Sequence, residues 1–369
     1  MPGLIDVNME MKSRYYIQFL ILGLIALVLS NCTKEDPDLF GDSNYVIVDK
    51  LSQNPDRLNY RHDRVPFKKL KSSQSTNNDQ YSFTLEYILE GPVVDGARVQ
   101  ASHIVYRSEK VYLSYNTNGE LVRGGMEVID FDDPTDPKLM TTGIRNAEFS
   151  SLDIYTKPST GKSYLMLAGS GYNASGIVSS QLRLFQLNSL GYPLLNPEII
   201  DLEGYTATDV NALGVVTGSY GGFYTVDELT LNFANLENEL EDARSVAYNP
   251  TDGQYCVLLG NPGRLVTGLP DNPKTIQLGG ISYEGTKAIV RIRNGFAYAA
   301  LGDGGLKVVD LASGLITASI DRPEVPEGQN PKNYVTNAVS VNETGLIFIA
   351  NGAAGVYVAK ITDLGQLEL

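Results

Sequence analysis

The last third of the chain contains one sequence pattern twice, and this repeat restricts the fold more than any other feature. Residues 296–311 (FAYAALGDGGLKVVDL) align with residues 346–361 (LIFIANGAAGVYVAKI) at a constant offset of 50 positions. Each copy consists of an apolar strand, a glycine-rich turn and a second strand, and another short strand precedes each copy, at 288–292 and 338–341. The Asn294-Gly295 pair between two such strands is typical of a tight β-hairpin. The repeating unit is therefore predicted to be a small antiparallel sheet.

Units of the same kind can be traced further upstream, although less regularly. Six units begin near residues 98, 147, 207, 243, 286 and 336. Short-stranded sheets that repeat at roughly 40 to 50 residues are typical of β-propeller blades, because one such sheet cannot bury its faces alone. We therefore expect an all-β fold, a six-bladed β-propeller. Seven blades are the alternative, because residues 45–49 (YVIVD) also resemble a strand.

The ring of a propeller must be closed, because an open ring leaves strand edges exposed. Residues 81–89 (YSFTLEYIL) form an apolar, strand-like segment ahead of the first unit. We expect this N-terminal strand to complete the last blade. The propeller would then occupy residues 81–369.

Two of the units resemble the LVIVD repeat. The resemblance rests on residues 126–138 (MEVIDFDDPTDPK) and 306–311 (LKVVDL), and it extends over residues 98–369 in period and strand pattern. The LVIVD family occurs in bacterial and archaeal surface proteins and is thought to form β-propellers. The resemblance implies a propeller and a surface location, and it brings no established chemistry.

The N-terminus is typical of an export signal that is cleaved in front of a lipidated cysteine. Lys12 and Arg14 precede an apolar run over residues 15–29, which is shorter than the roughly 20 residues of a membrane-spanning helix. Leu29 stands three residues before Cys32, as in a bacterial lipobox. Residues 1–31 are therefore predicted to be a lipoprotein signal peptide. An ordinary secretory signal with an incidental cysteine is the alternative.

The true start is predicted to be Met11, because Asp6 and Glu10 are unusual ahead of a basic signal region. Lipidation at Cys32 would attach several acyl chains of the palmitate type, and several chains anchor a protein stably. The Lys34-Glu35-Asp36 run that follows resembles the surface-export signal of Bacteroidota lipoproteins. We therefore expect anchoring in the outer membrane, facing the exterior, with residues 32–80 as a tether.

Composition excludes several classes of function. The formal net charge of −14 argues against nucleic acid, whose phosphates require a basic surface. Cys256 is the only cysteine besides Cys32, and it lies in an apolar run that predicts a buried structural thiol. With His62 and His103 as the only histidines, no histidine-rich metal cluster is expected, and no cofactor is predicted.

A candidate ligand site follows from the predicted blades. In a four-stranded meander, the start of the innermost strand and the loop between the second and third strands lie at the same end. Polar residues should therefore converge at one mouth of the central channel. The set predicted near the channel is Arg98 or His103, Ser150, Asp209, Arg244, Lys287 and Asn337. Further out, the turns between second and third strands should contribute Asn116, Asn173, Tyr220, Asn261, Asp303 and Asn351, and Asp303 is counted with the candidate ligand site. The alternative is that these side chains only bond neighbouring loops or water.

Sequence motifs for catalysis are weak. No serine lies in a nucleophile elbow, and nothing in the sequence pairs two carboxylates as a glycosidase requires. The aspartates of residues 130–137 fit turns better than a calcium loop. The predicted function is a non-enzymatic binding or scaffold module for a protein or glycan partner at the cell surface. The alternatives are a surface polysaccharide hydrolase or lyase with its site at the channel mouth, and a subunit of a larger outer-membrane assembly.

Overall fold

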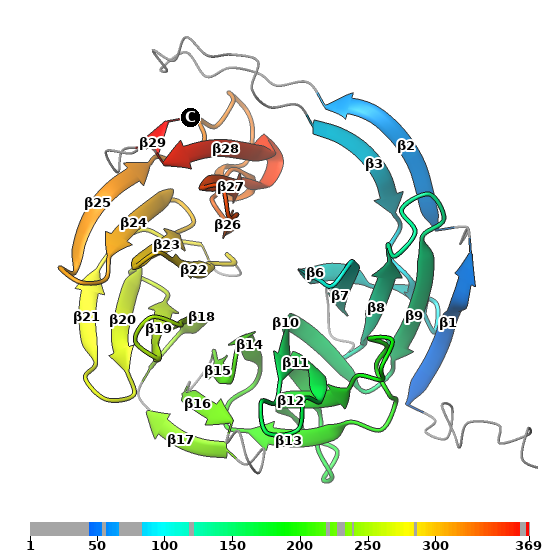
Figure 1. The fold of residues 1–369 in the computed structure, drawn as a ribbon. Coiled ribbons are helices and arrows are strands. Elements are labelled where there is room, and N and C mark those ends of the chain that lie inside the picture. Colours follow the sequence, from blue (N-terminus) through cyan, green and yellow to red (C-terminus); the bar gives the residue numbers. More distant parts are fainter. Residues whose placement is uncertain are drawn as a thin grey trace, which may run out of the picture. The chain divides into compact units, whose positions relative to one another are not determined.

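Six antiparallel sheets follow one another around a central channel in a computed structural model of the chain (Figure 1). The structure describes residues 44–53, 57–65, 83–117, 122–218, 222–226, 233–237, 240–283, 286–361 and 367–368. The expected signal peptide and Cys32 lie outside the described residues. Among the described residues, no helix is both long enough and apolar enough to cross a membrane. The prediction of an all-β, six-bladed propeller is confirmed.

Each blade is a meander whose first strand lines the channel. The first blade contains β6 (Gln100–Arg107), β7 (Lys110–Asn116), β8 (Gly124–Asp130) and β9 (Lys138–Ile144), and the second contains β10 (Ala147–Thr156), β11 (Ser163–Tyr172), β12 (Val178–Gln186) and β13 (Glu198–Leu202). The third contains β14 (Ala207–Asn211), β15 (Gly214–Thr217), β16 (Phe223–Val226) and β17 (Phe233–Glu237). The predicted unit starts at 147 and 207 therefore coincide with the starts of innermost strands, and the predicted start at 98 lies two residues before β6.

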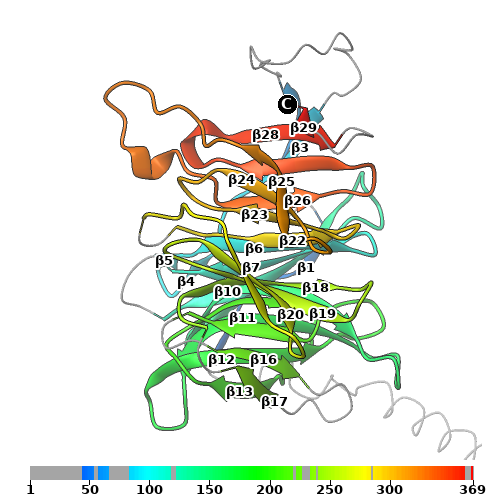
Figure 2. The ribbon, with the colours of Figure 1, turned by 90° about the vertical axis from the view of Figure 1, so that its left-hand side faces the viewer.

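The remaining blades follow the same order. The fourth contains β18 (Ala243–Asn249), β19 (Gln254–Leu259), β20 (Arg264–Leu269) and β21 (Lys274–Gln277), and the fifth contains β22 (Val290–Arg293), β23 (Phe296–Ala300), β24 (Leu306–Asp310) and β25 (Leu315–Ile320). The sixth contains β26 (Ala338–Val341), β27 (Leu346–Ala350), β28 (Val356–Ile361) and β29 (Leu367–Glu368). Two short 3₁₀ turns, η1 (Pro331–Asn333) and η2 (Gly352–Ala354), flank β26 and β27 in the sequence. Figure 2 shows the blades from the side.

The apolar core lies between blades, because each sheet buries one face on its neighbour. Phe149 and Leu152 of the second blade pack with Met126 of the first, and Val210 of the third packs with Met166 of the second. These five side chains are all essentially inaccessible to solvent. This arrangement explains why no single unit of the repeat could fold alone.

The innermost strands of the first four blades share a local irregularity. In each, the register against the second strand shifts by one residue, between Ala101 and His103, Phe149 and Ser151, Ala207 and Asp209, and Ala243 and Ser245. Such a β-bulge turns the next side chain relative to a regular strand. The residues that follow the bulges are His103, Ser151, Asp209 and Ser245, and they form the centre of the site described below.

The N-terminal strands do not complete the last blade. The segment expected to do so contains β3 (Phe83–Leu89), which pairs with β2 (Leu58–Val65) in a separate two-stranded sheet. The fourth strand of the last blade is β29, from the C-terminal end of the chain. The strand-like segment at 45–49 belongs to β1 (Tyr45–Gln53), which adds a fifth strand to the outer edge of the first blade. A short hairpin, β4 (Val93–Val94) and β5 (Ala97–Arg98), precedes the first blade.

The β2–β3 sheet is held on the first blade by a buried carboxylate. The Glu127 side chain of β8 is inaccessible to solvent and accepts hydrogen bonds from Tyr115, Thr141 and Arg57. Arg57, immediately before β2, also donates to Thr141 Oγ1 at 2.8 Å. Burial raises the pKa of Glu127, and the arginine charge opposes that rise. The segment that leads into β2 is therefore fastened to the first blade by a pair of opposite charges.

Candidate functional site

A single carboxylate organises the central channel. Ser151 and Ser245 each donate a hydrogen bond to Asp209, at 2.5 Å to Oδ1 and 2.5 Å to Oδ2. The backbone N–H groups of Val210 and Val246 donate to the same carboxylate at 2.9 and 3.1 Å. Asp209 is inaccessible to solvent, and four donors from three blades therefore take the place of water around it. We call Asp209, Ser151 and Ser245, together with His103 and Arg291, the channel cluster.

Arg291 crosses the channel from the fifth blade. Its Nη1 lies 3.5 Å from Asp209 Oδ2, and its Nη2 lies 2.9 Å from Nε2 of His103 on the first blade. A guanidinium has donors and no acceptor, so Nε2 of His103 must accept this hydrogen bond as the unprotonated nitrogen of a neutral ring. The proton then sits on Nδ1, which lies 3.0 Å from the carbonyl oxygen of Leu152.

The surroundings keep His103 neutral. Burial lowers its pKa to about 4, and the positive charges of Arg291 and Lys287 act in the same direction, whereas Asp209 opposes the shift. A histidine in this state is a hydrogen-bond bridge rather than a base with a free nitrogen, because both ring nitrogens are occupied.

Lys287 lies next to the channel cluster, at the end of the channel where the innermost strands begin. Its ammonium group donates to the carbonyl oxygen of Ser102 at 2.9 Å, and its side chain remains accessible to solvent. Desolvation by the surrounding protein lowers the pKa of Lys287, and the negative charge of Asp209 partly offsets this effect. Lys287 and Arg291 thus both join the fifth blade to the first.

A second carboxylate, Asp153, lies two residues beyond Ser151 on the same strand. Its oxygens accept hydrogen bonds from the backbone N–H groups of Ile154 at 2.7 Å and Ala212 at 2.6 Å, and from the Asn211 side chain at 3.2 Å. Burial raises its pKa. Both channel carboxylates are therefore engaged by neighbouring blades, and the arrangement serves primarily to bond inner strands to one another.

The predicted site residues divide into two groups. His103, Asp209 and Lys287 are brought together in the channel. Arg244 lies at the start of β18 in a 2.5 Å ion pair with Asp242, and it donates to the carbonyl oxygen of Thr286 at 3.1 Å. It therefore borders the channel cluster without a described hydrogen bond to it.

Arg98, Asp303 and Asn337 lie outside the channel cluster. Arg98 is exposed on the β4–β5 hairpin, where it meets Glu90 at 3.5 Å. Asp303 is in the β23–β24 turn, and its Oδ1 is enclosed without a hydrogen-bond partner among the described residues. Asn337 is half-buried before β26, and its side-chain nitrogen is near the position that a Cβ on Gly352 would occupy.

The outer turns contribute local contacts. Asn173 accepts hydrogen bonds from the N–H groups of Ser175 and Ile177, and the buried Asn351 accepts one from Thr336. Asn116 ends β7 and Asn261 precedes a cis proline, whereas Tyr220 lies outside the described residues. The side chains of Asn173 and Asn351 are therefore engaged in local hydrogen bonds.

Ser151, Ser245 and Arg291 were not predicted from the sequence. A signal for the serines exists, because four segments share one pattern in which a polar residue stands third and an apolar residue fourth. The segments are ASHI at 101–104, FSSL at 149–152, ATDV at 207–210 and ARSV at 243–246. Each polar residue follows a bulge. Arg291 has no such signal, because its role depends on its reach across the ring.

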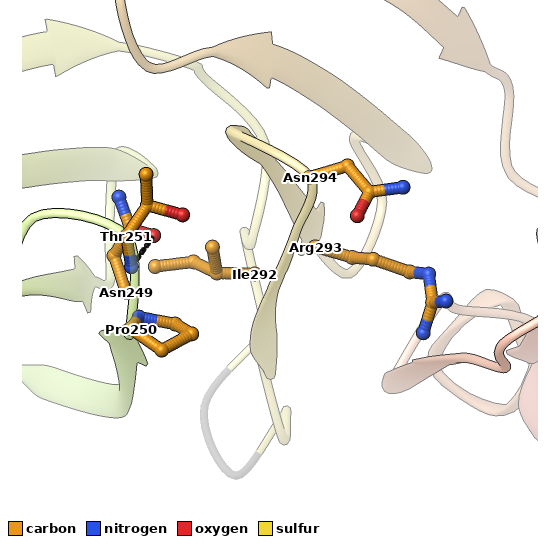
Figure 3. A pocket seen from close by; sticks show the side chains of 6 residues that line it. All are labelled: Asn249, Pro250, Thr251, Ile292, Arg293 and Asn294. Atoms are coloured by element: carbon orange, nitrogen blue, oxygen red, sulfur yellow. Dashed lines mark hydrogen bonds between the residues drawn. The ribbon is translucent and has the colours of Figure 1, made fainter.

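A shallow pocket lies at the opposite end of the blades, between the β18–β19 and β22–β23 loops (Figure 3). Its volume is about 290 Å³, and its lining residues are Asn249, Pro250, Thr251, Ile292, Arg293 and Asn294. The Asn249 side chain donates a hydrogen bond to Asp252 and accepts one from the N–H of Thr251. Figure 3 shows Arg293 pointing away from Asn249, and Arg293 donates to the carbonyl oxygen of Glu343. The pocket therefore lacks converging polar groups.

Within the described part of the chain, no cluster of three or more His, Cys, Asp or Glu side chains could hold a metal ion.

Comparisons with known proteins agree with the fold. No family model matches the chain, and no curated protein sequence matches it, so the resemblance to the LVIVD repeat stays a prediction. Among solved structures, a chain of the mitotic checkpoint complex is 11% identical, with 82% of this chain and 86% of that chain covered and a TM-score of 0.53. Saccharomyces cerevisiae Sqt1 is 12% identical over 73% of this chain and 74% of that one, with a TM-score of 0.52. The WD40 repeats of RRP9 are 10% identical over 74% and 80%, with a TM-score of 0.51. At these identities the likeness establishes the β-propeller and no activity.

Proposed function

We propose that the chain is a lipoprotein of the outer membrane, anchored through Cys32 and facing the exterior, whose propeller is a non-enzymatic binding or scaffold module for a protein or glycan partner. The observation that carries the non-enzymatic part of the proposal is the saturation of the channel cluster. Asp209 accepts from four donors, and His103 is bonded at both ring nitrogens. General acid–base catalysis needs a group within reach of a substrate proton, and these groups are occupied by one another.

The alternative of a polysaccharide hydrolase or lyase is weaker, because a hydrolase requires two carboxylates on either side of a substrate. Asp153 and Asp209 are the available pair, but each is enclosed by donors from adjacent blades. A hydrolase would have to break these bonds before it could bind a sugar. The geometry therefore favours binding by the loops and outer faces of the blades.

The lipid anchor is tested by metabolic labelling with palmitate. Wild-type protein should incorporate label and fractionate with outer membranes, whereas Cys32→Ala should lose the label and accumulate with its signal uncleaved or in the soluble fraction. Cys256→Ala is the matched control, because it removes the other cysteine and should keep the label. Label retained in Cys32→Ala would contradict the anchor. If added protease failed to cut the protein on intact cells, the outward orientation would be contradicted.

The partner is tested by crosslinking the native lipoprotein in cells, followed by affinity purification and mass spectrometry. A stoichiometric outer-membrane protein would identify an accessory or assembly subunit, and recovery of the propeller alone would direct attention to glycan arrays. Turnover of a polysaccharide by the purified chain, lost in Asp209→Asn or Asp153→Asn variants that remain folded, would contradict the non-enzymatic role.

A further inference from the structure

The innermost strand of the first blade leaves two large apolar side chains uncovered. Ile104 and Tyr106 of β6 are 61% and 67% exposed. They share one face of the strand, because alternate residues of a strand point the same way. His103 and Val105 point to the opposite face, where they contact the second blade. The uncovered face therefore points away from the second blade.

The bulges allow the same position to be compared in other blades. Ile104 directly follows the first residue after the bulge, His103. The equivalent positions in the next three inner strands are Leu152, Val210 and Val246. These three are 0%, 1% and 0% exposed, because each packs on the blade that precedes its own. Ile104 differs because no complete sheet precedes the first blade among the described residues.

The β2–β3 sheet fills only part of that preceding position. Leu58 and Leu89 pack against a buried cluster of the first blade that includes Ile129 and Leu139 of the outer strands β8 and β9. Figure 1 shows β2–β3 between the first and sixth blades, with β3 on the side nearer the channel. In the described part of the chain, β3 pairs only with β2, so its inner edge carries free backbone donors and acceptors.

We infer that this position binds a two-stranded extended segment of a partner protein, which pairs with the inner edge of β3 and covers Ile104 and Tyr106. A strand edge accepts an extended chain through its backbone, and pockets for alternate side chains then give specificity. The apolar surface formed by Ile104 and Tyr106 is continuous with the apolar surface that the β2–β3 sheet contacts. Leu113 and Val111, the cross-strand neighbours of Ile104 and Tyr106, belong to the cluster that β2–β3 already contacts. The bound segment would complete a seventh blade.

This inference goes beyond the proposed function, because it depends on the propeller and not on where the chain is located. A suitable probe is a fluorescein-labelled peptide with the sequence of residues 288–300 (AIVRIRNGFAYAA), which contains the inner hairpin of the fifth blade and so has the pattern that the position requires. Binding to the full chain in detergent is measured by fluorescence anisotropy. Backbone pairing is measured by hydrogen exchange of the amides of β3.

Saturable binding is expected, with slower exchange of the β3 amides in the complex. Ile104→Thr combined with Tyr106→Thr should weaken binding about tenfold or more, whereas Leu315→Thr, at a side chain that is 66% exposed on β25, should not. All three substituted side chains are exposed and threonine is a good strand former, so the thermal midpoints should stay close to that of the wild type.

Four results would overturn the inference. The first three are absence of saturable binding, binding that the double variant retains, and binding without added protection of β3. Self-association of the wild-type chain that disappears in the double variant would also overturn it, because the occupant would then be a second copy and not a partner.

Discussion

Arg291 and His103 belong to the fifth and first blades, and their side chains meet across the channel at 2.9 Å. Lys287 makes a parallel link to the carbonyl oxygen of Ser102. The fifth and first blades are therefore joined through the channel. Strand pairing does not join the N-terminal strands to the last blade, because β3 pairs with β2, and the last blade obtains its fourth strand from the C-terminal end of the chain. The channel cluster therefore links blades that are not neighbours in the sequence.

Stability should depend on pH through His103. Its pKa is about 4 in the folded chain, below the ordinary value of 6.5, because of burial and the charges of Arg291 and Lys287, with Asp209 opposing them. Between these two pH values the unfolded chain binds the proton and the folded chain does not. The contribution of neutral His103 is therefore complete above about pH 6.5, and the free energy of unfolding falls as the pH is lowered toward 4.

Urea denaturation at a series of pH values measures this effect. His103→Gln should reduce the slope of unfolding free energy against pH in this window, and His62→Gln, at the only other histidine, should keep the wild-type slope. An unchanged slope in His103→Gln would show that other groups carry the pH dependence.

Asp209→Asn should be strongly destabilising. The amide can accept through only one of its two terminal atoms, so the donors of Ser151 and Ser245 cannot both be satisfied, and Arg291 loses its buried counter-charge. The expected loss is about 2–4 kcal/mol of unfolding free energy, by analogy with other broken buried charge networks. Asp271→Asn, on an exposed turn, is the matched control and should change stability by no more than about 0.5 kcal/mol. Similar midpoints for the two variants in urea would contradict the organising role of Asp209.

The contact between Arg57 and Glu127 should behave as a coupled pair. Arg57→Met leaves Glu127 buried without its positive partner, and a cost of about 2–4 kcal/mol is expected. Adding Glu127→Gln to Arg57→Met should recover part of this loss, because the second change removes the buried charge. A double-mutant cycle from urea denaturation gives the coupling energy, and additive effects would contradict the pairing. Arg98→Met, in an exposed ion pair with Glu90, should cost less than about 1 kcal/mol.

Local pattern predicts the blades well, whereas closure depends on distant contacts. The innermost strands begin at 100, 147, 207, 243, 290 and 338, close to the unit starts expected from hairpin periodicity. Strand β2 (LNYRHDRV) lacks apolar alternation, so the sequence offers no partner for residues 83–89, which were assigned to the last blade instead. Ser151 and Ser245 share a readable motif with Asp209, but the reach of Arg291 depends on the radius of the ring.

Cys256 should report on opening of the fourth blade. Its thiol is buried in β19 between neighbouring sheets, and burial raises its pKa to about 12. Only the thiolate reacts rapidly with alkylating agents, so the folded chain at pH 8 should resist iodoacetamide and the urea-unfolded chain should react at the rate of a free cysteine. Because the proposed lipid would occupy Cys32, the mature protein offers no other thiol. The Asp209→Asn substitution should then accelerate labelling of Cys256. If the thiol reacts only after global unfolding, the increase in labelling rate should equal the factor that the variant's loss of unfolding free energy predicts. Equal labelling rates in wild type and Asp209→Asn would instead mean that Cys256 is reached by a local opening that leaves the channel cluster intact.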